Sequence, residues 1–222
     1  MSDRTRIDHG FYRVNDATQK ALDGSAWLVG VGIGYEGFKL GLQDALEKTK
    51  ATSGGYPHKK LKTKDALLKM KLMFRKSHDK GRRVIVIGNG GSSAIASHIA
   101  TDYTKNAGIR TIAFNDSPTI TCMANDFGYP EVFAKQLEYY AHKDDIAVLI
   151  SSSGKSHNIL NAAVKAMDMK MQIITFTGML ESNPLRGYGD INFWVPSGDY
   201  GLVEITHLSL LHSITSIVSA NL

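Results

Sequence analysis

The stretch that most constrains the fold is VIVIGNGGSSAIASHIATD, from Val84 to Asp102. It opens with residues 84–87, which are all apolar and β-favouring. This run is too short for a helix and too apolar for a half-exposed strand, so it predicts a buried strand of a parallel sheet. The chain must then turn, because residues 88–91 contain three glycines.

The loop and the start of the next helix predict an anion-binding site. Ser92 and Ser93 stand where N-cap residues are common, before residues 94–104, in which small and apolar side chains alternate at helical spacing. Glycines let the backbone approach a ligand closely. The first N–H groups of a helix lack internal partners and lie at the positive end of the helix dipole. We therefore expect a phosphate to bind here; a tight turn without a ligand is the alternative.

Beyond residue 83, short apolar runs alternate with helical patterns. The runs predict strands at residues 84–87, 111–114, 146–150, 172–176 and 191–195. The helical patterns fall at residues 93–105, 131–140, 158–167 and 203–219. This alternation predicts an α/β fold, a three-layer α-β-α sandwich with a five-stranded parallel sheet. In such a sheet, ligands bind beyond the carboxyl ends of the strands.

A second polar loop follows the strand predicted at residues 146–150. Its sequence is SSSGKS, with hydroxyl groups at Ser151, Ser152, Ser153 and Ser156. Hydroxyls beside free backbone N–H groups suit a phosphate or a sugar phosphate. A serine-rich linker is the alternative, but a linker would not interrupt an α/β repeat at its ligand-binding edge.

The N-terminal segment contains a GxGxxG pattern that we do not interpret as a dinucleotide-binding loop. Its glycines, Gly32, Gly34 and Gly37, follow an apolar run and precede a helical pattern at residues 38–48. The strand that should come next is missing, because residues 51–64 are polar and basic. No acidic residue lies about twenty positions further on to bind a ribose. We expect these glycines at a helix contact or bend.

We expect two parts, a helical extension at residues 1–57 and an α/β domain at residues 58–222. Residues 53–60 contain two glycines and a proline and are the candidate linker. With 222 residues and 43% hydrophobic content, the chain is long enough to bury one core.

The net charge of +5 is unevenly distributed, because residues 58–83 hold 11 Lys or Arg side chains against two acidic ones. Such a stretch can mark a nucleic-acid surface. However, residues 64–77 carry an apolar stripe with the lysines on the other faces, which is typical of a solvated amphipathic helix. Aromatic residues for base stacking do not alternate with these lysines. Nucleic-acid binding is therefore the less favoured interpretation.

The single cysteine, Cys122, excludes an internal disulfide and fits a reducing compartment. It lies between Thr121 and Met123, and we expect a small core residue rather than a nucleophile. The sequence has no apolar run near the roughly 18 residues of a membrane span and no pattern of a secretory signal. We expect a soluble, cytoplasmic protein.

Four motifs together resemble the sugar-isomerase (SIS) domain family. They are GNGGS at residues 88–92, NDFG at residues 125–128, SSSGKS at residues 151–156, and a late helix with Glu204, His207 and His212. Within this family they are most similar to the phosphoheptose isomerases. The resemblance covers roughly residues 64–222 and does not extend to residues 1–57, which are longer than the usual N-terminal helix of the family.

The resemblance implies a flavodoxin-like SIS domain that isomerises a phosphosugar. The implied reaction converts sedoheptulose 7-phosphate to D-glycero-D-manno-heptose 7-phosphate through an enediol, in heptose biosynthesis for lipopolysaccharide (LPS) or capsule. It also implies a homotetramer with active sites shared between subunits. The implied substrate-binding residues are Asn89, Gly90, Gly91, Ser92, Asn125, Asp126, Ser151, Ser152, Ser153, Ser156 and Glu204.

The resemblance further implies a bound metal ion, taken to be zinc. The corresponding positions here are His98, Asp102, Glu204 and His212. Two of them depart from the family pattern, because Asp102 stands in place of Glu and Glu204 in place of Gln. His98 and Asp102 are four residues apart and share one helical face. The added negative charge of Glu204 should tighten cation binding and weaken Lewis acidity.

The last helix offers two histidines for this site. On an ideal helix, Glu204 and His212 are about 12 Å apart along the axis and about 80° apart in azimuth, whereas Glu204 and His207 share one face. Periodicity thus favours His207 and the family pattern favours His212. We follow the family and suppose that Glu204 lies at or before the first turn. We expect the other histidine to be a hydrogen-bonded interior residue.

In the implied mechanism, Asp102 is the base and a metal ligand, and His212 is the opposing acid and base. Asp102 is one methylene shorter than Glu and could reach the substrate proton less well. Two alternatives remain, a non-catalytic SIS domain that senses phosphosugars or binds proteins, and an isomerase of a different phosphosugar. The presence of both His98 and His212 argues against a pure scaffold.

Overall fold

The computed structural model describes the backbone of residues 26–55 and 57–219 and the side chains of residues 34–55 and 57–215. The chain divides into two compact units, Met1–Leu40 and Gly41–Leu222. Helix α2 (Ala26–Lys48) begins in the first unit and ends in the second. It is continuous through the GxGxxG pattern, so no strand leads into those glycines.

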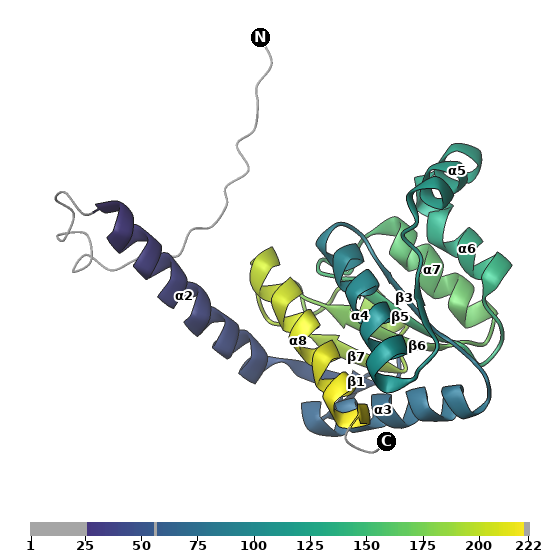
Figure 1. The fold of residues 1–222 in the computed structure, drawn as a ribbon, viewed down its shortest axis with the longest axis horizontal. Coiled ribbons are helices and arrows are strands. Elements are labelled where there is room, and N and C mark those ends of the chain that lie inside the picture. The colour runs from purple at the N-terminus through teal and green to yellow at the C-terminus, as the bar shows by residue number, and fades with distance from the viewer. Residues whose placement is uncertain (1–25, 56, 220–222) are drawn as a thin grey trace, which may run out of the picture. The chain divides into compact units, whose positions relative to one another are not determined.

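The second unit is built on a seven-stranded sheet in the order β2-β1-β7-β6-β5-β3-β4 (Figure 1). Five neighbouring strands are parallel: β3 (Val84–Gly88), β4 (Thr111–Ala113), β5 (Ile146–Ser151), β6 (Gln172–Thr177) and β7 (Ile191–Trp194). These are the five strands that the sequence predicts. Their spatial order is that of a flavodoxin-like doubly wound sheet, whose strand order reverses between β3 and β5.

The sheet has two strands more than the five predicted. These are β1 (Lys50–Ser53) and β2 (Lys59–Leu61), which form an antiparallel hairpin. β1 also pairs antiparallel with β7 and extends the sheet at that edge. The expectation of a linker at residues 53–60 is therefore wrong. Lysine-rich strands are common at sheet edges, where they oppose further pairing, and their composition resembles that of a loop.

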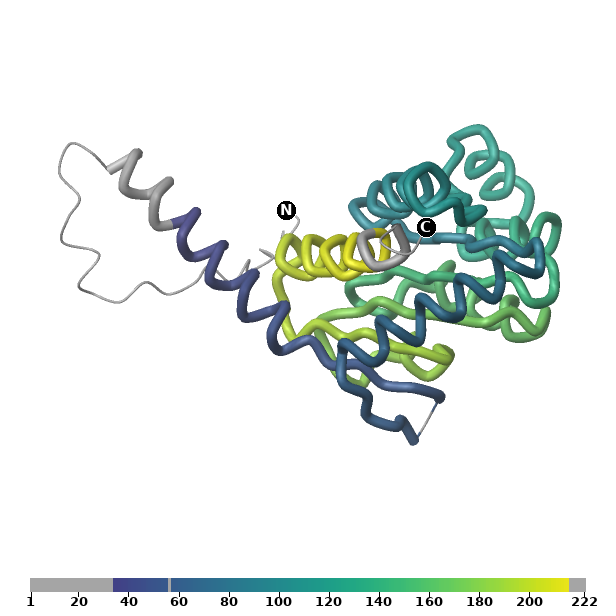
Figure 2. The backbone as a smooth tube through the Cα atoms, turned by 60° about the horizontal axis from the view of Figure 1, so that its bottom comes forward, coloured from purple at the N-terminus to yellow at the C-terminus, as the bar shows by residue number. Residues whose placement is uncertain are grey.

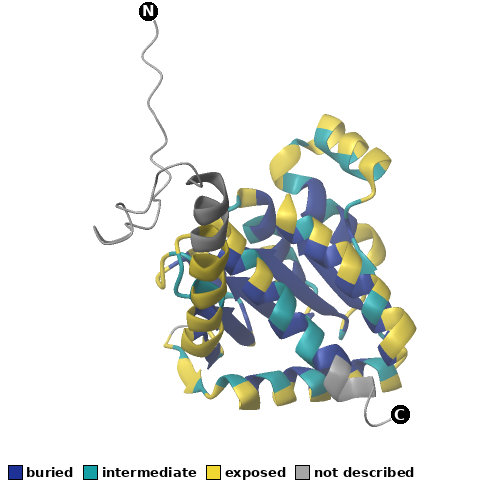
Figure 3. Ribbon diagram, turned by 60° about the vertical axis from the view of Figure 1, so that its left-hand side comes forward, coloured by how far each residue is buried: buried dark blue, intermediate teal, exposed yellow. Residues whose placement is uncertain are grey.

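Helices cover both faces of the sheet. One layer contains α3 (Thr63–Asp79), α4 (Gly91–Ala107) and α8 (Tyr200–Ser219), and the other contains α6 (Val132–Tyr140) and α7 (His157–Asp168). Alternate residues of each strand point to opposite faces, so Val84 and Val86 pack under the first layer and Ile85 and Ile87 under the second. The central parallel strands are accordingly buried, and the outward helix faces are exposed (Figure 3).

Helices α4 and α8 lie side by side in the first layer (Figure 2). Their contact is fixed by Tyr103, a fully buried residue of α4, whose hydroxyl donates to the carbonyl oxygen of Leu211 at 2.9 Å. Burial raises the pKa of this phenol well above its usual value. This packing fixes which side chains of the two helices can meet.

The sequence patterns do not predict α5 (Ser117–Phe127) or the short 3₁₀ helices η1 (Tyr129–Glu131) and η2 (Pro184–Gly187). None of the residues of α5 is buried, so its sequence lacks a continuous apolar stripe. Cys122 lies on this helix and is exposed, which contradicts the expectation of a core residue. Among the described residues, no helix is long and apolar enough to cross a membrane.

Candidate active site

The glycine-rich loop and the SSSGKS loop lie side by side at the carboxyl ends of β3 and β5. These strands pair in parallel, with Gly88 opposite Ile150, at the position where the strand order reverses. Between the loops lies a pocket of about 110 Å³. It is lined by Asn89, Ser92, Ile150, Ser151, Ser152, Ser153, Ser156, Tyr200 and Glu204. The structure thus brings together most of the predicted substrate-binding residues.

Helix α4 begins at Gly91, two residues before the predicted start at Ser93. Gly90 is the N-cap with φ +52°, a backbone conformation that favours glycine. Ser92 therefore lies in the first turn, is buried, and lines the pocket. The free N–H groups of this turn remain available to an anion.

The SSSGKS loop contributes neutral donors to the pocket. Its Ser151 hydroxyl donates to that of Ser156 at 3.4 Å. The buried hydroxyl of Ser152 has no hydrogen-bond partner among the described residues. Ser156 is the N-cap of α7, so the first turn of that helix also faces this region. A buried hydroxyl that lacks a partner and two helix N-termini are suited to bind a phosphate.

Gly154 fixes the conformation of this loop through its contacts with the segment between β6 and β7. Its φ is +62°, and a Cβ at this position would collide with the side chain of Asn183. The N–H of Leu185 donates to the Gly154 carbonyl oxygen at 3.2 Å. The segment between β6 and β7 therefore fixes the conformation of the SSSGKS loop.

A second set of polar residues, which the sequence patterns did not predict, orients Asn89. The amides of Asn89 and Asn158 donate to each other's oxygen atoms, both at 2.9 Å, and Asn158 is only 3% exposed. The hydroxyl of Tyr129 also donates to the Asn89 side-chain oxygen, at 3.2 Å. An asparagine at a buried position of the amphipathic α7 was the one signal that could have identified Asn158.

Glu204 lines the pocket between the two loops. Its carboxylate packs against Gly91, where any Cβ would collide with it, so it faces the positive N-terminus of α4. Burial raises the pKa of this carboxyl. The expectation that Glu204 lies at or before the first turn is wrong, because α8 begins at Tyr200.

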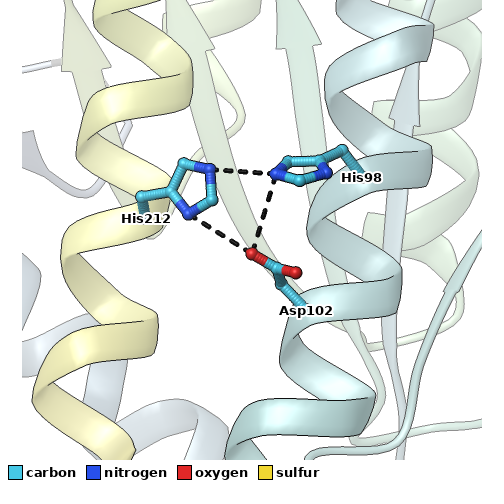
Figure 4. Close-up of side chains that lie close together, drawn as sticks. All are labelled: His98, Asp102 and His212. Carbon is cyan, nitrogen blue, oxygen red and sulfur yellow. Dashed lines mark hydrogen bonds and ion pairs between the residues drawn. The ribbon is translucent and has the colours of Figure 1, made fainter.

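His98, Asp102 and His212 form a cluster between α4 and α8 (Figure 4). The Nε2 atoms of the two imidazoles are 3.0 Å apart. Asp102 Oδ2 lies 3.7 Å from His98 Nε2 and 3.4 Å from His212 Nδ1. Two imidazole nitrogens at this distance repel each other if both present a lone pair. Either the N–H of one ring donates to the other ring, or a cation interacts with both lone pairs.

These three side chains fit a metal ion. Their ligand atoms all lie within 4.8 Å of one another. Two ligands of a tetrahedral zinc ion are about 3.3 Å apart for bonds of 2.0–2.1 Å, and zinc accepts imidazole and carboxylate alike. Glu204, the fourth position predicted for the metal, is not part of this cluster.

His207 points into the protein interior. It is fully buried, and its Nε2–H donates to the carbonyl oxygen of Thr177 at 3.0 Å. Burial lowers its pKa from 6.5 to about 4, so it is neutral at pH 7. The structure thus brings His212, and not His207, to His98 and Asp102.

Asn125 and Asp126 do not reach the pocket of their own chain. Both are exposed near the end of α5, where the Asn125 amide donates to Asp126 at 2.8 Å. Neither residue lines the pocket between the two loops.

Comparisons with known proteins agree with this fold. The family model of the SIS domain matches residues 58–178. The phosphoheptose isomerase of Helicobacter pylori (strain HPAG1) is 34% identical over 142 residues, which cover 61% of this chain and 73% of that protein. The phosphoheptose isomerase of Colwellia psychrerythraea is 35% identical over 150 residues, which cover 64% of this chain and 76% of that protein.

A solved phosphoheptose isomerase from Francisella tularensis superposes with a TM-score of 0.74 at 26% identity, covering 87% of this chain and 98% of that chain. The phosphoheptose isomerase from Neisseria gonorrhoeae has the same fold, with a TM-score of 0.73 at 22% identity over 85% of this chain and 97% of that chain.

Proposed function

The chain belongs to the SIS domain family, among the phosphoheptose isomerases, and on that basis we propose that it is an aldose–ketose isomerase acting on a phosphosugar. The proposed reaction converts sedoheptulose 7-phosphate to D-glycero-D-manno-heptose 7-phosphate, in heptose biosynthesis for LPS or capsule. One observation carries the proposal. The two loops that suit a phosphate lie beside the N-terminus of α4, and α4 also carries the His98–Asp102 pair.

We assign the substrate phosphate to the pocket between the two loops. The hydroxyls of Ser151, Ser152, Ser153 and Ser156 and the first N–H groups of α4 and α7 are its donors. Asn89 is held in place by Asn158 and Tyr129 and is suited to bind a sugar hydroxyl. Glu204 adds an acceptor for a sugar hydroxyl in the same pocket.

We assign a metal ion, with zinc as the expected metal, to His98, Asp102 and His212. A zinc ion bound there would supply Lewis-acid stabilisation of developing negative charge on a substrate oxygen. The resemblance also assigns Glu204 to the metal; within one chain this carboxylate lies in the phosphate pocket instead.

Two residues of this cluster can move protons. Asp102 would remove the proton from the carbon next to the carbonyl group, which forms the enediol, and would return a proton to the neighbouring carbon, the former carbonyl carbon. His212 would protonate and deprotonate the substrate oxygen atoms from the opposite helix. The side chain of Asp102 is 20% exposed and that of His212 is 41% exposed, so a substrate can reach both. A positioned base of this kind typically contributes about 10²- to 10⁴-fold to the rate.

We propose a homotetramer with shared active sites. A pocket of about 110 Å³ accommodates a phosphate, whereas small-molecule sites measure about 300–1,000 Å³. Asn125 and Asp126, which do not line the pocket of their own chain, would then contact substrate in a neighbouring subunit. We also propose a cytoplasmic location, in keeping with a phosphorylated substrate.

The direct test is incubation of the purified, zinc-loaded protein with sedoheptulose 7-phosphate in D₂O. We expect the aldoheptose phosphate to form with deuterium at C2, because the enediol exchanges its proton through an enzyme base. Treatment with a chelator should abolish product formation, and added zinc should restore it. If the substrate binds but neither product nor deuterium exchange appears, the chain is a phosphosugar sensor and not an isomerase.

A further inference from the structure

A second cavity, of about 840 Å³, lies at the sheet edge formed by the β1–β2 hairpin. The described residues that line it are distinct from those of the phosphate pocket. Four of them carry positive charge and one carries negative charge: Lys50, Lys60, Lys62, Arg186 and Glu181. Such a concentration of cations in a concave site attracts anions.

The hairpin register places two of the lining side chains next to each other. Ala51 and Leu61 are cross-strand partners and pack into the core beneath α3. Thr52 and Lys60 are the next partners along the hairpin, so they point to the opposite face of the sheet. A hydroxyl and an ammonium group are thus presented together, and both line the cavity.

Two buried donors at this cavity have no partner. Arg186 is 3% exposed and Thr52 is 5% exposed. Neither the Nε of Arg186 nor the hydroxyl of Thr52 has a hydrogen-bond partner among the described residues. The guanidinium Nη1 of Arg186 donates to the carbonyl oxygen of Glu181. Buried polar groups are nearly always paired, so unpaired donors on two residues that line a basic cavity are consistent with a missing acceptor.

Trp194 makes cation–π contacts with two of the cations at the edge of this site. The Nζ of Lys50 lies 4.9 Å from the centroid of the indole ring, and the guanidinium carbon of Arg186 lies 5.6 Å from it. Glu181 is shared between the same two cations, at 3.0 Å from Lys50 and 3.8 Å from Arg186. No ion pair of Lys60 or Lys62 is present among the described residues, so both side chains are available to a ligand, and the indole reports on changes around Arg186.

We propose that this cavity binds a phosphate-bearing small molecule of about nucleotide size, at a site separate from the active site. Arg186, Lys60 and the Thr52 hydroxyl hold the phosphate. A guanidinium group matches two phosphate oxygens at once, which lysine alone cannot do. The volume lies within the usual range of small-molecule sites. The basic stretch at residues 58–83 thus supplies Lys60 and Lys62 to a ligand.

Fluorescence of Trp194 tests the proposal. The chain has two tryptophans, so Trp27→Phe leaves Trp194 as the sole reporter. Inorganic pyrophosphate is the probe, titrated into the full-length protein. We expect a saturable change in emission with a Kd at or below about 1 mM. In this background, Thr52→Val and Lys60→Gln should each weaken binding by about tenfold or more.

Two control substitutions distinguish binding of pyrophosphate in this cavity from its binding at other anion sites. Lys143→Gln removes an exposed lysine before β5, and Ser153→Ala alters the phosphate pocket; both should leave the Kd unchanged. We chose Thr52 and Lys60 for substitution, and not Arg186, because a variant of the buried arginine could fail to fold. The proposal is overturned if pyrophosphate gives no saturable change. It is equally overturned if Ser153→Ala abolishes the signal while the hairpin variants retain it.

Discussion

Burial gives the two histidines of α8 different chemistry. His207 is enclosed and donates to a backbone carbonyl, whereas His212 faces Asp102 and His98 across a partly open gap. The spacing of His98 and Asp102 on α4 was sufficient to predict that they share a face. Which histidine of α8 joins them could not be predicted from periodicity, because it depends on how α8 packs against α4.

The buried His207 makes the stability depend on pH. Its pKa is lowered from 6.5 to about 4, so between these values the unfolded chain binds a proton here and the folded chain does not. The free energy of unfolding should therefore fall by about 3 kcal/mol as the pH decreases from 7 to 4. Urea unfolding at several pH values measures this.

His207→Gln keeps a donor for the Thr177 carbonyl and cannot gain charge, so it should flatten this pH dependence. His157→Gln alters an exposed histidine and should leave it unchanged. An equally steep pH dependence in the His207→Gln protein would show that other groups cause it.

A second comparison on the same helix tests the metal assignment. His212→Asn removes a proposed ligand and should reduce bound zinc from about one ion per chain to none, because two remaining ligands hold zinc weakly. His207→Gln should retain zinc. The measurement is elemental analysis of dialysed protein, and full zinc occupancy in the His212→Asn protein would contradict the assignment.

At the scale of elements, short β-favouring runs separated by helical patterns were sufficient to predict all five parallel strands. Buried parallel strands are continuously apolar, so their sequences are distinctive. The β1–β2 hairpin was missed because only Ala51 and Thr52 of β1 are buried and every residue of β2 is at least partly exposed. Its place in the sheet depends on pairing with β7, more than 100 residues away.

Substitution of two glycines that have the same φ angle tests whether packing against Gly154 maintains the conformation of the SSSGKS loop. Gly108 and Gly154 both have φ +62°, but a Cβ at Gly108 meets open space whereas one at Gly154 collides with Asn183. Gly108→Ala should cost only the strain of the left-handed conformation, about 1 kcal/mol of unfolding free energy. Gly154→Ala should cost more and should also raise the KM for the phosphosugar. Equal effects of the two substitutions on KM would contradict the proposed role of this loop.

In the whole molecule, the two polar loops and the His98–Asp102 pair lie in the same unit, Gly41–Leu222. The sequence could not reveal how a complete substrate site forms, because the pocket between the two loops is small and the exposed Asn125 and Asp126 do not line it. Assembly of several chains, which depends on surfaces and not on local patterns, is the proposed solution.

Subunit mixing tests this assembly. If Asp126 contacts substrate in a neighbouring subunit, Asp102→Asn and Asp126→Ala chains should each be nearly inactive alone. Random mixing after mild dissociation should restore about a quarter of the wild-type activity, because that share of sites combines two intact groups. No recovery in mixed oligomers of confirmed composition would place both groups in one chain.

The Asp102→Asn substitution tests whether Asp102 removes a substrate proton beside a phosphate held by the two loops. The substitution keeps the shape of the side chain but removes the base, so turnover of sedoheptulose 7-phosphate should fall by about a hundredfold or more while the substrate still binds. Asp102→Glu, the residue typical of the family, should remain active. Turnover of the zinc-loaded Asp102→Asn protein within about threefold of wild type would contradict the account.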